Sequence, residues 1–346
     1  MSLRDVLGIE HPIILGPFGG LSSVELVAAV SDAGGLGSYG LYGYTADRIR
    51  DTITQLRAAT ERPFAVNLWL PVGDEVTPDQ VDLTAASAVA EPLFTELGVL
   101  VPRPPERFLP SSDEQLQAVL DAAPAVLSVV YGVPSADLVT AAHERGIRIT
   151  GTVTTVAEAR AMDAAGVDAI VASGAEAAGH RVSFLAPAEQ SLIGTFALVP
   201  QVVDAVSAPV VAAGGIADRR GVAAAFALGA AGVQVGTAFL RTRQSAASEA
   251  HRQAIADAGD TTTVLTRAMS GRLSRGIPNR AMRTIEDGGA IAPFPAQNWL
   301  TGQFRAEAGK RGLGDYQSLW AGQSAALATR ADAAEVFAEL VAGLPV

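Results

Sequence analysis

Short apolar runs alternate with helix-like segments along most of the chain, and this alternation constrains the fold more than any other feature. Eight runs have the length and composition of strands: Pro12–Gly16, Leu36–Gly40, Pro63–Leu68, Ala125–Tyr131, Arg148–Thr152, Ala169–Ser173, Pro209–Ala213 and Val233–Thr237. They are almost continuously apolar, which is typical of parallel strands covered on both faces. Eight strand–helix units predict an α/β fold of the (β/α)₈ TIM-barrel type. A doubly wound parallel sheet is the alternative on this pattern.

Capping signals mark several of the intervening helices. Ser22–Glu25 and Ser111–Glu114 have the spacing of a capping box, and Thr45 precedes a third helical run. The segment Gly35–Gly40 matches G-x-G-x-x-G, but a dinucleotide-binding fingerprint requires a strand before it and a helix after it. Here the order is reversed. We therefore interpret these glycines as the end of a helix that runs into the second strand.

Two stretches fall outside the repeat. Residues 72–110 are longer than an ordinary strand-to-helix connection and are rich in proline and acidic residues, with a helix expected inside them. Residues 246–346 follow the eighth strand. Insertions on such barrels commonly cover the face where ligands bind. We predict a barrel over residues 1–245 with an insertion at 72–110, and a C-terminal extension over 246–346 with terminal helices, the additions forming a small lid domain.

Composition excludes several classes of protein. The chain has no cysteine, which excludes disulfides, thiolate nucleophiles, iron–sulfur clusters and cysteine-ligated zinc. A net charge of −11 argues against nucleic acid or an anionic membrane as a partner. No apolar run approaches the ~20 residues that span a bilayer, and the N-terminus lacks the pattern of a signal peptide. We therefore expect a cytoplasmic protein.

Glycine turns follow the last two predicted strands. Gly214 and Gly215 end the seventh strand, and Gly236 lies near the end of the eighth. In (β/α)₈ barrels the loops after these two strands form the usual phosphate site, with backbone N–H groups directed at the anion. The pattern predicts a phosphorylated cofactor or substrate. The alternative is two tight turns without a ligand.

Two polar residues stand at the C-terminal ends of other strands. Asn67 ends the third strand, where its amide can donate to and accept from a flavin or nucleobase. His180 follows the sixth strand, where catalysis takes place in these barrels, whereas His11, His143 and His251 lie elsewhere. His180 is the candidate acid–base residue, with a structural loop histidine as the alternative. No second histidine lies at the spacing of metal ligands from His180, so we expect no metal site. We expect Glu176 to face an arginine or backbone amides.

Several segments, taken in order, resemble the nitronate monooxygenases, formerly called 2-nitropropane dioxygenases. They are HPIILGPFGG, VNL, SGAEAAGH, APVVAAGGIADRRGVAAAFALGAAGVQVGTAFL, TRAMSGRLSRGIPN and LWAGQSAAL. The resemblance implies an FMN-dependent (β/α)₈ barrel. Such an enzyme oxidises a nitroalkane or its nitronate with O₂ to a carbonyl compound and nitrite, and the flavin carries the redox chemistry.

The resemblance also implies roles for individual residues. His180 would take a proton from the substrate or orient the nitronate. FMN would be held by Pro17, Phe18, Gly19, Asn67, Ser173, Ala178, Gly179, Gly214, Gly215, Gln234, Val235, Gly236 and Thr237. No metal is implied. The partners would be a small anionic substrate such as a nitronate and O₂, and the oligomeric state is open, with a homodimer as one option.

Four positions depart from the pattern of the family. Ser173 stands where members usually carry glutamine, Ala178 where they carry glycine, and Phe18 where many carry methionine. Val130 stands where many have a second histidine. Two other functions therefore stay open: an NADPH-dependent, FMN-containing enoyl-thioester (enoyl-ACP) reductase, and a non-catalytic barrel that binds flavin or phosphate.

Overall fold

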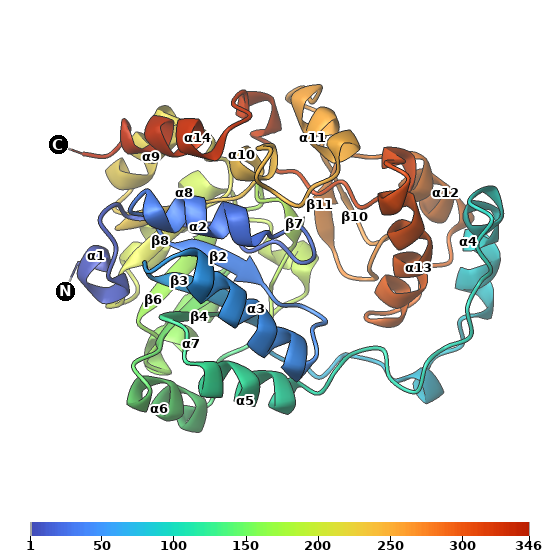
Figure 1. Ribbon diagram of the computed structural model, residues 1–346, viewed down its shortest axis with the longest axis horizontal. Coiled ribbons are helices and arrows are strands. Elements are labelled where there is room, and N and C mark those ends of the chain that lie inside the picture. The colour runs from blue at the N-terminus through green and yellow to red at the C-terminus, as the bar shows by residue number, and fades with distance from the viewer. Residues whose placement is uncertain (1, 346) are drawn as a thin grey trace.

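Eight parallel strands form the centre of the molecule in the computed structural model, which describes residues 2–345 (Figure 1). They are β1 (Ile13–Leu15), β2 (Gly37–Gly40), β3 (Phe64–Trp69), β4 (Val126–Val130), β5 (Arg148–Val153), β6 (Ala169–Ser173), β8 (Val210–Ala213) and β9 (Gly232–Val235). Their order is β1-β9-β8-β6-β5-β4-β3-β2, and a bridge between Ile14 and Leu36 brings β1 back beside β2. Neighbours in sequence are neighbours in space around a ring. The predicted TIM barrel is confirmed, and the doubly wound alternative is wrong.

The predicted strands all occur, with small differences at their ends. β3 and β5 each continue one residue beyond the prediction, to Trp69 and Val153. The last strand stops at Val235, whereas the prediction continued it to Thr237. That end of the prediction is wrong because Gly236 caps a helix that begins at Thr237.

Helices alternate with the strands and cover the outside of the barrel. The series is α2 (Val24–Asp32), α3 (Ala46–Ala59), α5 (Ser112–Ala122), α6 (Ala136–Glu144), α7 (Val156–Ala164), α8 (Thr195–Val203), α9 (Arg219–Ala227) and α10 (Thr237–Leu240). The predicted caps Thr45 and Ser111 each accept a hydrogen bond from a backbone N–H in the first turn, whereas α2 is capped by Ser23, one residue after the Ser22 of the predicted capping box. The Gly35–Gly40 segment is a helix end that leads into β2, which confirms our interpretation of its glycines.

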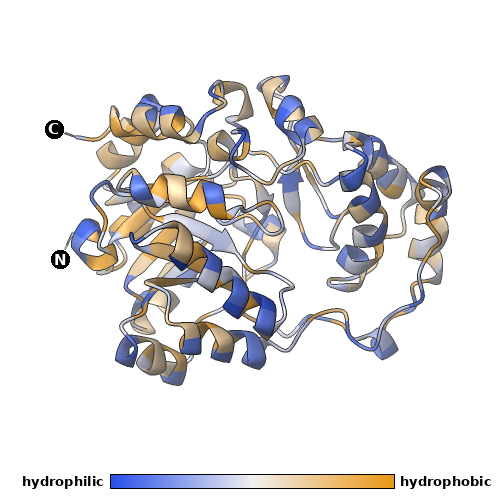
Figure 2. Ribbon diagram, viewed as in Figure 1, coloured by the Kyte–Doolittle hydropathy of each residue, from blue (hydrophilic) through white to orange (hydrophobic). Residues whose placement is uncertain are grey.

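Alternate residues along β1, β3, β4, β6 and β8 belong to two different cores. Ile14, Ala65 and Val171 pack inside the barrel with Leu3 and Leu7 of α1 (Leu3–Leu7), which closes its N-terminal end. The intervening residues pack against the surrounding helices. Side chains of a strand point alternately to its two faces, so one sequence supplies both layers. In Figure 2 an outer helix such as α3 carries hydrophilic stretches beside hydrophobic ones.

A smaller lobe is built from the insertion and part of the C-terminal extension (Figure 1). It contains α4 (Thr84–Glu96), α12 (Arg280–Gly288) and α13 (Ala296–Lys310), around a core in which Phe94 and Phe304 meet edge to face. The three-stranded sheet of β10 (Val264–Thr266), β11 (Ser274–Gly276) and β7 (Gly179–His180) joins the lobe to a barrel loop. The division of the chain into a barrel and a lid domain stays a prediction.

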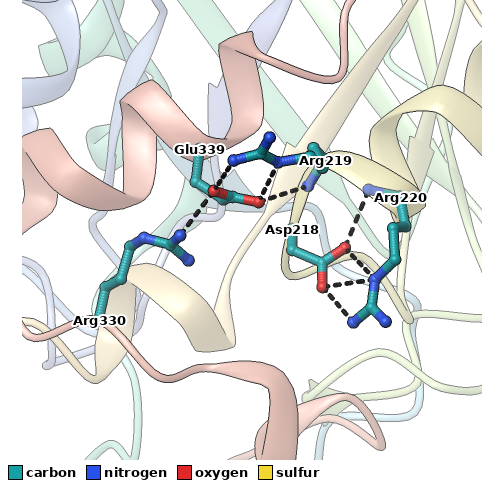
Figure 3. Close-up of polar contacts among 5 residues, drawn as sticks. All are labelled: Asp218, Arg219, Arg220, Arg330 and Glu339. Atoms are coloured by element: carbon teal, nitrogen blue, oxygen red, sulfur yellow. Dashed lines mark hydrogen bonds and ion pairs between the residues drawn. The ribbon is translucent and has the colours of Figure 1, made fainter.

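The end of the chain returns to the barrel. α14 (Ala333–Val341) packs against α2 and α9, beyond α11 (Glu249–Ala256). Figure 3 shows the polar contact that fixes it: Glu339 accepts hydrogen bonds from Arg219 at 2.7 Å and from Arg330 at 2.6 Å.

The remaining short elements are η1 (Pro78–Gln80), η2 (Ala188–Ser191), η3 (Gly314–Tyr316) and η4 (Ala325–Leu327). None of the helices described is both long and apolar enough to cross a membrane.

Close packing of α2 on β2 predicts that Gly37 cannot carry a side chain. A Cβ at Gly37 would lie 2.2 Å from the carbonyl oxygen of Val27, so we expect Gly37→Ala to lower the free energy of unfolding by about 1–3 kcal/mol. Gly309→Ala is the matched control, because a Cβ there meets nothing within 4 Å and alanine favours a helix by up to about 1 kcal/mol. Urea denaturation measures both. Equal effects of the two substitutions would contradict this packing.

Candidate active site

A cavity of about 350 Å³ lies at the C-terminal ends of the barrel strands, between the barrel and the lobe. Its walls contain inward-facing strand residues, the loops after β1, β6, β8 and β9, and residues of the C-terminal extension. The predicted site residues that line it are Pro17, Phe18, Gly19, Asn67, Ser173, Ala178, Gly179, His180, Gly214, Gly215, Gln234, Gly236 and Thr237. The fold therefore brings residues from five separate segments to one cavity.

Val235 is the one predicted site residue that does not line the cavity. It is fully buried in the layer between strands and helices, together with Val233 of the same strand. Gln234 lies between them and does line the cavity. Because successive side chains of a strand point to opposite faces, only one of two neighbours can face the barrel interior.

The loop after β8 has a left-handed backbone at two consecutive glycines, Gly214 and Gly215, which we call the glycine cradle. Gly214 and Gly215 have φ angles of +99° and +75°, a region that favours glycine. A Cβ on Gly214 would lie 3.1 Å from the amide nitrogen of Ala177 in the loop after β6. On the other side, the Thr237 hydroxyl accepts a hydrogen bond from the N–H of Gly322 at 3.0 Å. Small residues thus let three segments approach one end of the cavity.

Glu176 organises the loop after β6 from within. Both of its carboxylate oxygens accept a hydrogen bond from the N–H of Thr195 at 2.9 Å, and the Thr195 hydroxyl donates to Glu176 at 2.9 Å. This confirms that Glu176 faces a backbone amide. The negative charge lies at the start of α8, where a helix N-terminus stabilises it. Glu176 therefore holds the loop that carries Ala178 and His180 against α8.

His180 is fixed from two sides. It belongs to β7, whose partner β11 pairs Ser274 with His180. Its Nε2 lies 2.8 Å from the Ser270 hydroxyl, which donates its own hydrogen to the carbonyl oxygen of Arg272 at 3.1 Å. Nε2 is therefore occupied by Ser270. Nδ1 is the ring nitrogen that has no hydrogen-bond partner within residues 2–345.

The surroundings of His180 keep its imidazole neutral. Burial is the largest cause, and the positive charges of Arg272 and Arg305 add to it, so the pKa falls from 6.5 to about 3. Trp69 and Trp320 flank the ring with centroid distances of 4.9 and 5.5 Å. At neutral pH His180 is therefore an uncharged hydrogen-bonding group.

Asn67 presents its amide oxygen rather than its amide nitrogen. Its Nδ2 donates to the carbonyl oxygen of Ser128 at 3.1 Å and to the Ser128 hydroxyl at 3.2 Å. Within residues 2–345 the Oδ1 atom has no hydrogen-bond donor. The side chain is 3% exposed and lines the cavity, so the oxygen can accept from a ligand N–H.

Several cavity residues were missed from the sequence. They are Tyr42, Trp69, Glu176, Asn298, Arg305, Trp320, Gly322 and Ser324, among others. Trp320, Gly322 and Ser324 belong to the quoted segment LWAGQSAAL, so the family resemblance held a signal for them. Asn298 and Arg305 lie on α13 of the lobe, and no periodicity in the barrel could place them there.

The other histidines lie away from the cavity. His143 is on α6 and pairs with Asp168, and His251 is buried on α11, where Nε2 donates to the carbonyl oxygen of Trp320 at 2.9 Å. His11 precedes β1. Across residues 2–345 no three histidine, aspartate or glutamate side chains gather in a way that could hold a metal ion.

The buried His251 predicts that the fold loses stability in mild acid. Burial lowers the pKa of His251 to about 4, below the ordinary 6.5. Between these two values the unfolded chain binds a proton that the folded chain does not bind, so the free energy of unfolding at pH 5 is about 2 kcal/mol lower than at pH 7. Denaturation of His251→Gln between pH 7 and 5 should show a shallower loss than the native chain. An identical pH slope would contradict this origin of the acid sensitivity.

Comparison with known proteins agrees with this geometry. The family model for nitronate monooxygenase matches residues 1–343. A probable nitronate monooxygenase of Staphylococcus aureus is 40% identical over 346 residues, covering 98% of this chain and 96% of that protein. The solved structure of a nitroalkane oxidase from Streptomyces ansochromogenes has a TM-score of 0.85 and 35% identity, covering 98% of each chain. The solved structure of FabK from Thermotoga maritima has a TM-score of 0.76 and 29% identity, and the match covers 99% of this chain and 95% of that chain. The chain belongs to the nitronate monooxygenase family of oxidoreductases.

Proposed function

We propose that this protein is an FMN-dependent nitronate monooxygenase that converts alkyl nitronates and O₂ to a carbonyl compound and nitrite. The observation that carries the proposal is the meeting, in one cavity, of a glycine cradle and a neutral histidine. The cradle suits a phosphate, and the histidine suits a substrate whose reaction needs a fixed acceptor. The nitroalkane oxidase similarity supports a nitro compound as the substrate.

The cavity fits FMN at both ends. At one end, the backbone at Gly214, Gly215 and Gly236 is free of side chains, and Thr237 begins α10, so the phosphate would lie against N–H groups and a hydroxyl. Further along, Pro17, Phe18 and Gly19 would contact the isoalloxazine ring, and the Asn67 oxygen would accept from a ring N–H. Ser173, Ala178, Gly179, Gln234 and Val235 would complete the site, Val235 through its backbone. When bound, FMN would accept electrons from the substrate and pass them to O₂.

The state of His180 favours a nitronate over a neutral nitroalkane. A base with a pKa of about 3 takes a proton from a weak carbon acid only at a large cost in free energy. A nitronate has already lost that proton. Its negative charge would also offset the positive charge of Arg272 and Arg305, which raises the pKa of His180 towards its ordinary value. In this proposal His180 Nδ1 therefore orients the nitronate and receives a proton only when the anion is bound.

The identity of the cofactor and the substrate gives the first prediction of this proposal. The purified protein should carry FMN, identified by absorbance near the flavin maxima and by mass after heat release. It should form nitrite from ethyl nitronate while consuming O₂, and turnover with nitroethane should be slower by at least about tenfold. A protein that neither contains flavin nor takes up FMN would refute the proposal.

Substitution of His180 tests the role of that residue. We expect His180→Ala to lower kcat/KM for ethyl nitronate by about 10²-fold or more, while the FMN content stays unchanged, because the histidine acts on the substrate. His143→Ala is the matched control, since His143 lies on α6 away from the cavity. Unchanged kinetics in His180→Ala would remove His180 from the mechanism.

The phosphate cradle can be tested with two glycines of almost equal backbone strain. Gly215 and Gly146 have φ angles of +75° and +72°, so alanine strains each site alike, but only Gly215 lines the cavity. We expect Gly215→Ala to weaken FMN binding about tenfold or more and Gly146→Ala to leave it unchanged. Titration of the apoprotein with FMN measures both affinities. Equal FMN affinities in the two variants would contradict the placement of the phosphate.

A further inference from the structure

Arg305 brings a positive charge from the lobe to the cavity wall. It lies on α13, beside Asn298 of the same helix, and both side chains line the cavity with Trp320. Nothing in the barrel holds it, so its place depends on the lobe. The guanidinium is the charged group of the lobe that lines this cavity.

All the hydrogen-bond partners of Arg305 in the structure are neutral. Nη1 donates to the Ser318 hydroxyl at 2.9 Å. Nη2 donates to the carbonyl oxygen of Asn298 at 2.9 Å and to its Oδ1 at 2.7 Å. Nε is buried without any partner. Of the five N–H groups of an arginine, the Nε hydrogen and one Nη1 hydrogen are thus left over.

Arg272 is a second arginine near the cavity, and its charge has partners that Arg305 lacks. Its Nη2 pairs with Asp74 and lies 2.8 Å from Glu75, and its guanidinium covers the rings of Phe294 and Tyr131 at 3.9 and 4.3 Å. Two carboxylates therefore balance its charge. No salt bridge formed by residues 2–345 includes Arg305.

The half-buried charge of Arg305 has no carboxylate partner among residues 2–345, and an anion in the cavity would balance it. Burial lowers the pKa of Arg305 to about 10, so the guanidinium is still charged at neutral pH. Withdrawing a charged group from water costs free energy unless an opposite charge accompanies it. Its field also reaches His180, whose imidazole it helps to keep neutral. An anion bound near Arg305 and His180 would balance the guanidinium charge and would offset its effect on the imidazole.

We propose that Arg305 binds the anionic group of the substrate and makes the cavity selective for small organic anions over their neutral counterparts. The Nη1 hydrogen that has no partner would donate to a nitronate or carboxylate oxygen, with His180 and Trp320 on the same cavity wall. This inference deepens the proposed function by assigning its substrate charge to one residue. Anion binding by Arg305 can be tested separately from the oxidation of the substrate.

Binding of an unreactive pair of ligands to the purified holoenzyme tests the inference. Propanoate and propanamide have nearly the same shape and differ in charge, and isothermal titration calorimetry measures both. We expect the native protein to bind propanoate more tightly. In Arg305→Met the affinity for propanoate should fall about tenfold or more, because a charge-assisted hydrogen bond is lost. Arg305→Lys should recover most of it, and propanamide should bind all three proteins alike.

The control removes a positive charge from the same region. Arg311 ends α13 on the surface and pairs with Glu307 at 2.8 Å, so Arg311→Met should leave propanoate binding unchanged. The thermal midpoint of each variant checks that it is folded. Propanoate binding that is unaffected in folded Arg305→Met would overturn the inference. Loss of FMN from this variant would also overturn it, because Arg305 would then serve the cofactor.

Kinetics separate this inference from the proposed reaction. If ethyl nitronate is turned over, Arg305→Met should raise its KM about tenfold or more and change kcat much less. If no nitronate is turned over, the proposed function fails, but the difference in propanoate affinity still decides whether Arg305 is an anion site. Turnover with an unchanged KM in Arg305→Met would leave the function intact and refute the role of Arg305.

Discussion

The two-residue alternation of the barrel strands is the constraint on which the rest of this structure depends. One set of side chains fills the barrel and the other packs under the helices, so strands such as β3 and β6 are buried on both faces. At the C-terminal end of the barrel, the inward set changes from apolar to polar residues such as Asn67 and Gln234. The cavity is therefore the continuation of the barrel interior, and a one-residue shift in a strand would remove its polar lining.

The charges at and near the cavity differ in how they are balanced. Glu176 accepts hydrogen bonds from Thr195, and Arg272, just outside the cavity lining, pairs with two carboxylates. Arg305 has only neutral hydrogen-bond partners among residues 2–345, and burial together with Arg272 and Arg305 keeps His180 neutral. In the function that we propose, this cavity would receive an anion that is already deprotonated, and Arg305 would contribute a group of the lobe to its binding.

Sequence reasoning reached the fold, the glycine turns, Asn67 and His180 from local patterns, and it reached the rest of the predicted cavity lining through the family resemblance. Strand composition, caps such as Thr45 and the glycines after β8 depend on neighbours along the chain. The side chain of Val235 faces away from the cavity, and the sequence does not state which face of a continuous apolar run points inward. Arg305 could not be found in this way, since its proposed role depends on the position of α13 beside the cavity and on its lack of a carboxylate partner among residues 2–345.

The most direct test of the central account is the colour of the flavin under anaerobic conditions. Rapid mixing of the holoenzyme with ethyl nitronate should reduce the flavin and lower its visible absorbance, and subsequent O₂ should restore it. Mixing with NADPH should produce no comparable change. Prompt bleaching by NADPH together with no response to the nitronate would contradict the account and would identify the barrel as a reductase.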